Sequence, residues 1–401
     1  MKILVVNSFY YPNMLGGTEH SVKLLAEGLR EQGHDLAIYC IDNFQKDIKK
    51  DVINDIVVYR GKAGLFNIEK MVKKNGNLKS KIKNKIIELR NYTALREFNF
   101  VLGDFSPDVV HTNNLFGISP LFWKICKKKN IKIVHTLRDY WLLSPTCSLE
   151  IEKKKSIFIK LTLVIYRYYF RRQTKYVDIV TAPSQFTLNK FIDKGYFKYS
   201  IKEHINNSIK IDISDTKEII EEKRRKKDSI IKFLFVGSLY EIKGVKNLLY
   251  VFNKIDNSNI RLNICGDGEL KPLVENYCLN DDRILYKGKL NSEELKIEFI
   301  NNDVLIIPSI WDEPFGRVVI EANQYGLPVI GSNKGGIFEI INNSKTGETF
   351  QFDDLQDLKN RIELFSSREY VKKYFNNIEK NILEYSLQKQ IELFLKLYSK
   401  Q

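Results

Sequence analysis

The sequence contains no uncharged apolar run of the roughly 18 residues that a membrane-spanning helix requires. Its longest apolar run, residues 157–170, is interrupted by Lys160 and Arg167. The N-terminus enters a strand-like stretch at residues 2–7 and lacks the apolar region and cleavage site of a signal peptide. We therefore expect a protein that crosses no bilayer and stays in the cytoplasm.

Cysteine is scarce and scattered along the chain. The five cysteines are odd in number and form no Cys-x-x-Cys pair, so reduced thiols fit better than disulfides or a zinc site. They are Cys40, Cys126, Cys147, Cys265 and Cys278. Internal repeats and low-complexity tracts are also missing. What remains is an ordinary globular composition, and 401 residues predict two or three domains.

Acidic residues are few in the first half of the chain. Residues 1–210 contain 36 Lys and Arg against 19 Asp and Glu, a balance of +17, whereas the remaining 28 and 30 give −2. No nucleic-acid motif accompanies the basic residues, so we predict no nucleic-acid partner. They concentrate at 70–90 and 153–175, where lysines alternate with Phe, Tyr and Ile. This pattern favours peripheral contact with an anionic membrane surface, although a solvated helix face or ordinary core packing also explains it.

Apolar strands and amphipathic helices alternate through the chain, which predicts an α/β protein with parallel sheets. The pattern restarts at residue 230, so we expect two Rossmann-like, doubly wound domains that face a cleft, 1–210 and 211–375. Predicted strands are 2–7, 35–40, 108–111, 132–136, 176–181, 231–236, 260–265, 283–287, 303–307 and 329–332. Predicted helices include 21–30, a lysine-rich helix from about 67–90 to 103, 120–129, 292–301 and one long final helix, 378–399.

Two glutamates flank a predicted helix start after the strand 303–307. Pro308 and Pro314 delay the helix until Phe315 or Gly316, so Glu313 lies in the preceding loop and Glu321 lies about a turn and a half inside. Helical side chains lean toward the N-terminus, so both carboxylates can face one small volume.

The first amides of this helix are predicted to face the same volume. Those of Arg317, Val318 and Val319, together with the helix dipole, form an anion site suited to a diphosphate. Two hydroxyl-binding carboxylates beside a phosphate site indicate a nucleotide-sugar pocket.

The residues around this stretch resemble the motif of the retaining GT4-type glycosyltransferases. The matching positions are Pro308-Ser309, Phe315-Gly316, Glu321-Ala322, Gly326-Leu327-Pro328-Val329-Ile330 and Gly335-Gly336 with Glu339. The resemblance implies the two-domain GT-B fold, with residues 376–401 returning to the first domain. It also implies a UDP- or GDP-linked donor and a glycan or polyprenyl-linked acceptor, in bacterial surface polysaccharide synthesis.

The resemblance assigns roles residue by residue. Glu313 is expected to hold the sugar hydroxyls as a catalytic residue, and Glu321 the ribose. The other expected donor-binding residues are Gly16, Gly17, Lys243, Phe315, Gly316, Arg317 and Val318. Arg138 is the second catalytic candidate, and Glu19, His111 and Asp139 are assigned to the acceptor side. The sequence lacks an Asp-x-Asp motif, so we expect neither a metal nor a cofactor.

Two positions depart from the family pattern. Arg138 stands where these enzymes carry histidine, and arginine stays protonated, so it can stabilise charge but cannot act as a base. His135 is read as a strand residue rather than a substitute. Ser238 replaces a customary arginine, which leaves diphosphate binding to Lys243, with Arg138 or Arg317 as replacements.

Two alternatives stay open at this stage. A nucleotide-sugar epimerase shares the two-domain architecture but needs acid and base side chains, and none of the five histidines lies in the second half. A non-catalytic nucleotide-sugar-binding paralogue is conceivable because of Arg138 and Ser238. Turnover with donor and acceptor separates both from a transferase.

Overall fold

The computed structural model describes residues 1–14, 16–42, 48–62, 89–145, 147 and 157–400. The chain forms two compact units. Unit 1 comprises Met1–Ser208 and Leu387–Gln401, and unit 2 comprises Ile209–Ser386. The lysines predicted to form a helix at 67–88, and those at 153–155, lie outside the described residues.

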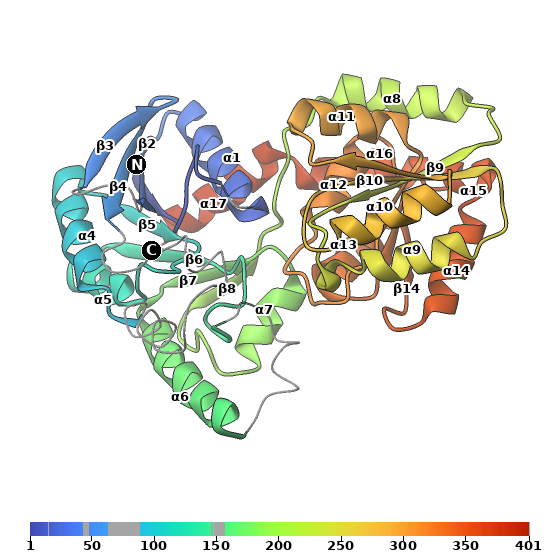
Figure 1. Cartoon of the computed structure of the whole chain (residues 1–401). Helices are drawn as coiled ribbons and strands as arrows, with labels where there is room; N and C mark the ends of the chain where they lie inside the picture. The colour runs from blue at the N-terminus through green and yellow to red at the C-terminus, as the bar shows by residue number, and fades with distance from the viewer. Residues whose placement is uncertain (15, 43–47, 63–88, 146, 148–156, 401) are drawn as a thin grey trace. The chain divides into compact units, whose positions relative to one another are not determined.

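The described residues of unit 1 form an eight-stranded sheet in the order β3-β4-β2-β1-β5-β6-β7-β8 (Figure 1). Neighbouring strands are parallel except for β3, which pairs antiparallel with β4. The strands are β1 (Lys2–Val6), β2 (Asp35–Asp42), β3 (Lys49–Ile53), β4 (Ile56–Lys62), β5 (Val109–Thr112), β6 (Lys132–Thr136), β7 (Ile179–Ala182) and β8 (Ile201–His204). The predicted opening βαβ unit is therefore present, and the β3–β4 hairpin and β8 are additions to the predicted set.

Helices cover the sheet of unit 1. They are α1 (Gly17–Glu31), α4 (Tyr92–Phe105), α5 (Leu121–Lys128), α6 (Ile157–Gln173), α7 (Gln185–Ile192) and α17 (Leu387–Ser399). The last helix packs against the first, because Ile391 and Phe394 share a buried apolar cluster with Leu25 and Leu29. The C-terminal segment thus completes the core of unit 1.

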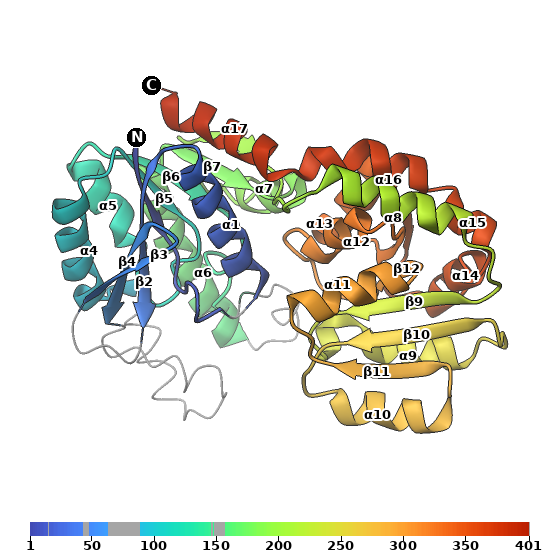
Figure 2. The same cartoon turned by 90° about the horizontal axis from the view of Figure 1, so that it is seen from above.

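Unit 2 contains a six-stranded, all-parallel sheet in the order β11-β10-β9-β12-β13-β14, whose first three strands lie side by side in Figure 2. The strands are β9 (Ile231–Val236), β10 (Ile260–Cys265), β11 (Ile284–Gly288), β12 (Val304–Ile307), β13 (Val329–Ser332) and β14 (Gly347–Phe350). The helices are α8 (Ile213–Arg225), α9 (Val245–Asn253), α10 (Lys271–Asn280), α11 (Ser292–Asn301), α12 (Arg317–Gln324), α13 (Gly335–Ser344), α14 (Leu355–Leu364), α15 (Arg368–Lys372) and α16 (Phe375–Asn381).

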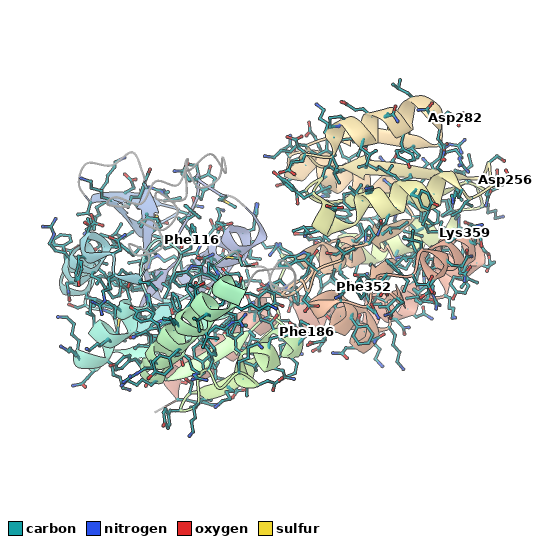
Figure 3. All side chains as sticks on the ribbon, turned by 60° about the horizontal axis from the view of Figure 1, so that its bottom comes forward. Phe116, Phe186, Asp256, Asp282, Phe352 and Lys359 are labelled. Atoms are coloured by element: carbon teal, nitrogen blue, oxygen red, sulfur yellow. The ribbon has the colours of Figure 1, made fainter. Side chains whose placement is uncertain are left out.

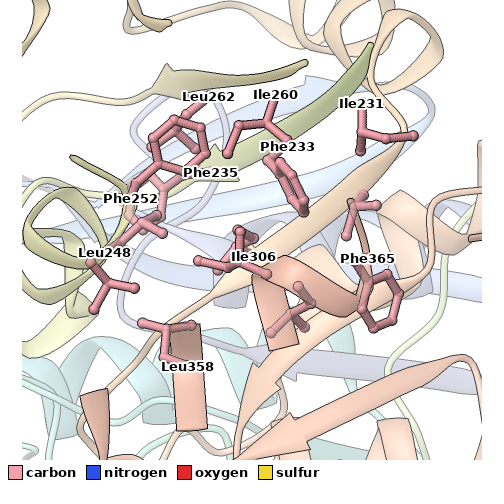
Figure 4. Packing of buried hydrophobic residues seen from close by; sticks show 14 of the residues in the cluster. Ile231, Phe233, Phe235, Leu248, Phe252, Ile260, Leu262, Ile306, Leu358 and Phe365 are labelled. Carbon is pink, nitrogen blue, oxygen red and sulfur yellow. The ribbon is translucent and has the colours of Figure 1, made fainter. Parts of the chain in front are cut away.

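Apolar side chains of β9 pack against the helices of unit 2 to form its core (Figure 4). Phe233 meets Phe252 of α9 edge to face at 6.2 Å between ring centroids, and Ile306 of β12 belongs to the same buried cluster. These two strands are mostly apolar and largely buried, as parallel strands covered by helices on both faces must be.

The α/β class and the parallel sheets are confirmed, while some element boundaries were wrong. The first helix begins at Gly17, four residues before the predicted start. The predicted final helix 378–399 is broken, because a 3₁₀ turn at Ile382–Tyr385 and extended Ser386 separate α16 from α17. All five cysteines are free thiols, as expected. None of the described helices combines the length and apolar composition needed to span a bilayer.

Candidate functional site

Glu313 and Lys243 meet at the carboxyl edge of the sheet of unit 2. Glu313 lies in the loop between β12 and α12 and is only 9% exposed. Its Oε1 accepts a hydrogen bond from Lys243 Nζ at 2.7 Å, and Lys243 closes the 3₁₀ turn Glu241–Lys243 after β9. The same ammonium group lies 5.6 Å from the centroid of the Trp311 ring. Two residues predicted for the donor site are therefore brought together by the fold.

A glycine fixes the loop that carries Lys243. Gly244 has φ +73°, and a Cβ at this position would lie 1.8 Å from the carbonyl oxygen of Pro308. The amide of Ile310 also donates to the carbonyl of Ile242 at 2.9 Å. Only a residue without a side chain permits this contact, so Gly244 sets the distance between the β9 and β12 loops.

The start of α13 holds the Glu313 loop from the other side. The Gly336 amide donates to the carbonyl oxygen of Glu313 at 2.8 Å. A Cβ on Gly336 would lie 2.5 Å from Cα of Phe315, so this approach of two backbones also requires glycine. The predicted Gly335-Gly336 pair therefore positions Glu313 by direct backbone contact.

Helix α12 begins close to the predicted position. Gly316 is its N-cap with φ +94°, and Arg317 is the first helical residue. The Val319 amide donates to the Gly316 carbonyl at 2.9 Å, which corrects the prediction that Val319 serves an anion. Arg317 and Val318 stay the predicted amide donors, since the first amides of a helix have no intrahelical partner. The Phe315 side chain is buried and faces Tyr385, so its backbone is the part suited to a ligand.

Glu321 has its own cation. Its Oε1 accepts from Arg317 Nε at 2.6 Å, one helical turn earlier, and both side chains are partly exposed. Lys243 therefore forms an ion pair with Glu313, and Arg317 forms one with Glu321. The two predicted carboxylates thus lie in different ion pairs.

A third ion pair of this region, between Lys334 and Asp312, was not predicted from the sequence. Lys334 Nζ lies 3.8 Å from Asp312 and 3.8 Å from the ring centroid of Phe352, which Figure 3 labels. Lys334 is the N-cap of α13, directly before the two glycines, and its side chain is mostly buried. A lysine that precedes a glycine pair at a strand end is the signal that could have identified it.

In unit 1, Gly16 and Gly17 are exposed at the start of α1. Gly16 is the N-cap, with extended backbone, and its amide donates to Oε2 of Glu19 at 2.8 Å. Glu19 is buried and caps the helix, because a carboxylate satisfies the unpaired amides of a first turn. Glu19 thus has a structural role as a helix cap, and its place on the acceptor side stays a prediction.

Asp139 belongs to a hydrogen-bond network at the carboxyl edge of the sheet of unit 1. Its Oδ2 accepts from Asn114 Nδ2 at 2.6 Å, and its Oδ1 accepts from the Trp141 amide at 2.7 Å. Asn114 is itself fixed, because Ser8 Oγ donates to its Oδ1 at 3.0 Å. Burial raises the pKa of Asp139 to about 6, against the lowering effect of both donors. Asn114 and Ser8 were not predicted, because they follow different strands and belong to no motif.

Arg138 lies beside Asp139 but has different partners. Its Nε donates to Asn113 Oδ1 at 2.7 Å, and its Nη1 donates to Asn207 Oδ1. The Arg138 side chain is almost completely buried. Asn207 lies one residue before Ser208, where the first segment of unit 1 ends. Consecutive asparagines after β5 therefore hold consecutive charged residues after β6.

His111 is a core residue, which corrects its predicted place on the acceptor side. Its ring nitrogens lie 2.7 Å from the Tyr398 hydroxyl and 2.7 Å from Thr136 Oγ1, and no part of it is exposed. Burial, followed by the charge of Arg138, holds the pKa of His111 well below its usual range. Because α17 carries Tyr398, His111 binds this helix to the sheet.

The interpretation of His135 as a strand residue is confirmed. It is buried in β6, and its Nδ1 lies 2.9 Å from Thr112 Oγ1. Burial lowers its pKa to about 3, so the ring is neutral. His135 is therefore held as a neutral, buried residue of the sheet.

Two family models match the chain and together span most of it. The model described as glycosyl transferases group 1 matches residues 216–384, and that described as glycosyltransferase family 4 matches residues 15–201. A relative from Klebsiella pneumoniae, described as an uncharacterized 42.6 kDa protein in the cps region, is 31% identical over 89% of this chain and 91% of its own length.

Solved structures of similar fold align over the whole chain. Sucrose-phosphate synthase from Thermosynechococcus elongatus aligns with a TM-score of 0.73 at 18% identity, covering 99% of this chain and 98% of that one. The Anabaena protein HepE, in complex with UDP, aligns with a TM-score of 0.68 at 16% identity, covering 100% of both chains. The chain has the GT-B architecture that these structures share.

Proposed function

Because the chain belongs to the family of glycosyl transferases group 1, we propose that it moves a sugar from a nucleotide diphosphate sugar to an acceptor with retention of anomeric configuration. The observation that carries the proposal is the ion pair of Glu313 and Lys243, which three strand-end loops fix in place. Lys243 is a cation suited to a diphosphate, and Glu313 is a carboxylate suited to sugar hydroxyls. A single hydrogen bond joins the two side chains.

Unit 2 is proposed to bind the donor. Lys243 and the first amides of α12, at Arg317 and Val318, neutralise the diphosphate. Glu313 holds the hydroxyls of the transferred sugar, and Glu321 holds the ribose. The complex of HepE with UDP supports a nucleotide diphosphate as ligand class, and we propose a UDP- or GDP-linked sugar.

Unit 1 is proposed to supply the acceptor side, with Gly16 and Gly17 at the exposed start of α1 and Asp139 at the sheet edge. Asp139 accepts a hydrogen bond from the attacking hydroxyl. The bond from the anomeric carbon to the diphosphate oxygen breaks, the bond to the acceptor oxygen forms on the same face, and the acceptor proton passes to the departing diphosphate. Arg138 contributes a positive charge to the same loop of unit 1.

The acceptor is proposed to be a glycan or polyprenyl-linked sugar in surface polysaccharide synthesis, at the inner face of the cell membrane. The relative from the cps region supports this pathway class. The basic balance of residues 1–210 supports an anionic surface as the place of action.

A thermal-shift screen tests donor binding. A ligand that binds only the folded state raises stability, so UDP, GDP or one of their sugars should raise the melting temperature, whereas the nucleosides should not. Turnover should then persist in EDTA, since we propose a metal-independent reaction. If an NMR time course with donor alone shows that the protein interconverts the sugars, the protein is an epimerase instead.

A further inference from the structure

Helix α6 presents an unusual outer surface in unit 1. Leu161, Val164, Ile165 and Tyr168 are 63%, 61%, 64% and 51% exposed. Their spacing places them on one face of the helix, over two turns. Other exposed large apolar side chains of the described chain are spread one or two to an element. A continuous exposed stripe of this kind marks an interaction surface, whereas scattered ones do not.

Basic residues continue the same face. Arg171 and Arg172 follow the stripe by one turn and are exposed, and Lys160 precedes it. Arg172 Nη1 donates to the Tyr168 hydroxyl at 3.1 Å, and both guanidinium groups lie within 6.0 Å of its ring centroid. Residues 157–173 include no acidic side chain. The surface therefore combines apolar area with positive charge.

The opposite face of α6 is anchored to the loop that follows β6 and carries Asp139. The Tyr166 hydroxyl donates to the Trp141 carbonyl at 2.6 Å, and Arg167 Nε donates to the Leu143 carbonyl at 2.8 Å. Phe170 packs edge to face on Trp141 at 4.7 Å between ring centroids. The Trp141 amide in turn donates to Asp139. One residue thus separates α6 from the proposed acceptor carboxylate.

We propose that α6 is a membrane-docking helix that binds an anionic bilayer surface through this stripe, which is formed by Leu161, Val164, Ile165, Tyr168, Arg171 and Arg172. Charge complementarity commits the surface to anionic lipid, because a helix with an apolar face and basic flanks lies in the plane of such an interface. Figure 1 shows α6 along the outside of unit 1. The inference deepens the proposed function, since it brings a lipid-linked acceptor to the loop that carries Asp139.

Vesicle co-sedimentation tests the proposal with the full chain. The parent should sediment with vesicles that contain phosphatidylglycerol, should stay in solution with phosphatidylcholine alone, and should be released by high salt. The double variant Leu161→Gln, Ile165→Gln should lower the partition coefficient at least about tenfold, and so should Arg171→Glu with Arg172→Glu. All these side chains are exposed, so the melting temperature should stay at the parent value.

Matched controls come from unit 2. Leu279 and Ile297 are exposed, as are Arg225 and Lys227. Leu279→Gln with Ile297→Gln, and Arg225→Glu with Lys227→Glu, should each bind vesicles within about twofold of the parent, because they make the same chemical changes away from α6. Binding by the α6 variants equal to that of the parent would overturn the proposal.

Other occupants of the stripe give distinct results. Sedimentation velocity that shows a dimer broken by Leu161→Gln with Ile165→Gln, and no vesicle binding by the parent, would assign the stripe to a second copy of the chain. A UDP- or GDP-induced thermal shift without vesicle binding rejects the docking helix alone. Vesicle binding without any nucleotide response rejects the proposed transferase and keeps the docking helix.

Discussion

Lys243 Nζ lies 2.7 Å from Oε1 of Glu313, although the two residues are 70 positions apart in the sequence. In the proposed function, the ammonium group must exchange this carboxylate for the donor diphosphate. The carboxylate is then released to the hydroxyls of the sugar. Donor binding and the release of Glu313 are thus two consequences of one exchange.

Glu313→Gln should separate binding from catalysis. The amide frees Lys243, so affinity for the nucleotide diphosphate should be kept or increased, while kcat should fall about 10²-fold or more because a charged contact to the transferred sugar is lost. Isothermal titration and initial rates measure the two effects. Lys243→Ala is the matched control and should mainly weaken diphosphate binding. Near-normal turnover by folded Glu313→Gln would remove this residue from the catalytic set.

Glu321→Ala should weaken nucleotide binding by roughly 1–3 kcal/mol, the usual loss for a charged hydrogen bond that is partly buried. Because Glu321 also holds Arg317, the variant Arg317→Ala tells the two effects apart. If Arg317→Ala weakens binding as much as Glu321→Ala, and the double variant adds nothing, the ribose contact is excluded and the ion pair alone matters.

Gly244→Ala should abolish donor binding and lower the melting temperature by many degrees, since its Cβ would fall on the Pro308 carbonyl. Gly33→Ala is the control: Gly33 also has φ of +80°, but no atom lies within 4 Å of its added Cβ. It should show only the cost of a left-handed backbone, roughly 1 kcal/mol. Equal effects of the two variants would contradict the role of the β9–β12 loop contact.

Arg138→Lys should retain more activity than Arg138→Ala or Arg138→His, provided the positive charge is used. Lysine keeps this charge but cannot bond Asn113 and Asn207 together as the planar guanidinium does. All three variants should therefore lose stability in thermal melts. A histidine variant as fast as the parent would show that the charge is not used and that Arg138 is a structural residue.

Asp139 should impose a pH dependence on turnover. With a pKa of about 6, its ionised form is lost as the pH falls below 6, so kcat/KM should fall there, and Asp139→Asn should be slow and lack this limb. Stability has the opposite sign. The folded-state pKa is raised, so the stabilising contribution is full below about pH 4 and lost as the pH rises through about 6.

Chemical denaturation at two pH values checks this sign. Relative to the parent, Asp139→Asn should be more stable at pH 8 than at pH 4. At pH 8 the parent buries a charged carboxylate, whereas the variant buries a neutral amide. An unchanged difference would show that Asp139 is not buried in its ionised form.

Several elements of unit 2 were predicted to the residue, among them β9, β10 and β13. Strands β9 and β10 are mostly apolar, and Gly237 and Gly266 directly follow them, which is why their limits can be read in the sequence. The β3–β4 hairpin was missed because its strands carry charges on an edge of the sheet. The Asn54-Asp55 pair was the signal in the sequence. Both residues adopt the positive φ that a two-residue hairpin turn requires, and Asn and Asp tolerate it better than most residues.

The site was predicted as a set of residues but not as a set of contacts. The motif located Glu313, Glu321 and Lys243, whereas the pairing of Lys243 with Glu313 depends on loops that meet only in the folded sheet. The break before α17 is similarly invisible, because residues 382–386 contain neither glycine nor proline. His111 was misassigned because a histidine at a strand end looks the same whether a substrate or a tyrosine from the last helix bonds it.

The first and last residues of unit 2 lie next to each other. Ile209 forms a parallel bridge with Ser386, and its amide donates to the Tyr385 carbonyl at 3.0 Å. The segment Ile209–Ser386 is therefore a cassette inserted into unit 1 between two adjacent cut points. Exchange of this cassette between relatives requires two junctions placed side by side. If unit 2 binds the donor as proposed, exchange of this segment would change the donor-binding unit while unit 1, with its own sheet and core, is kept.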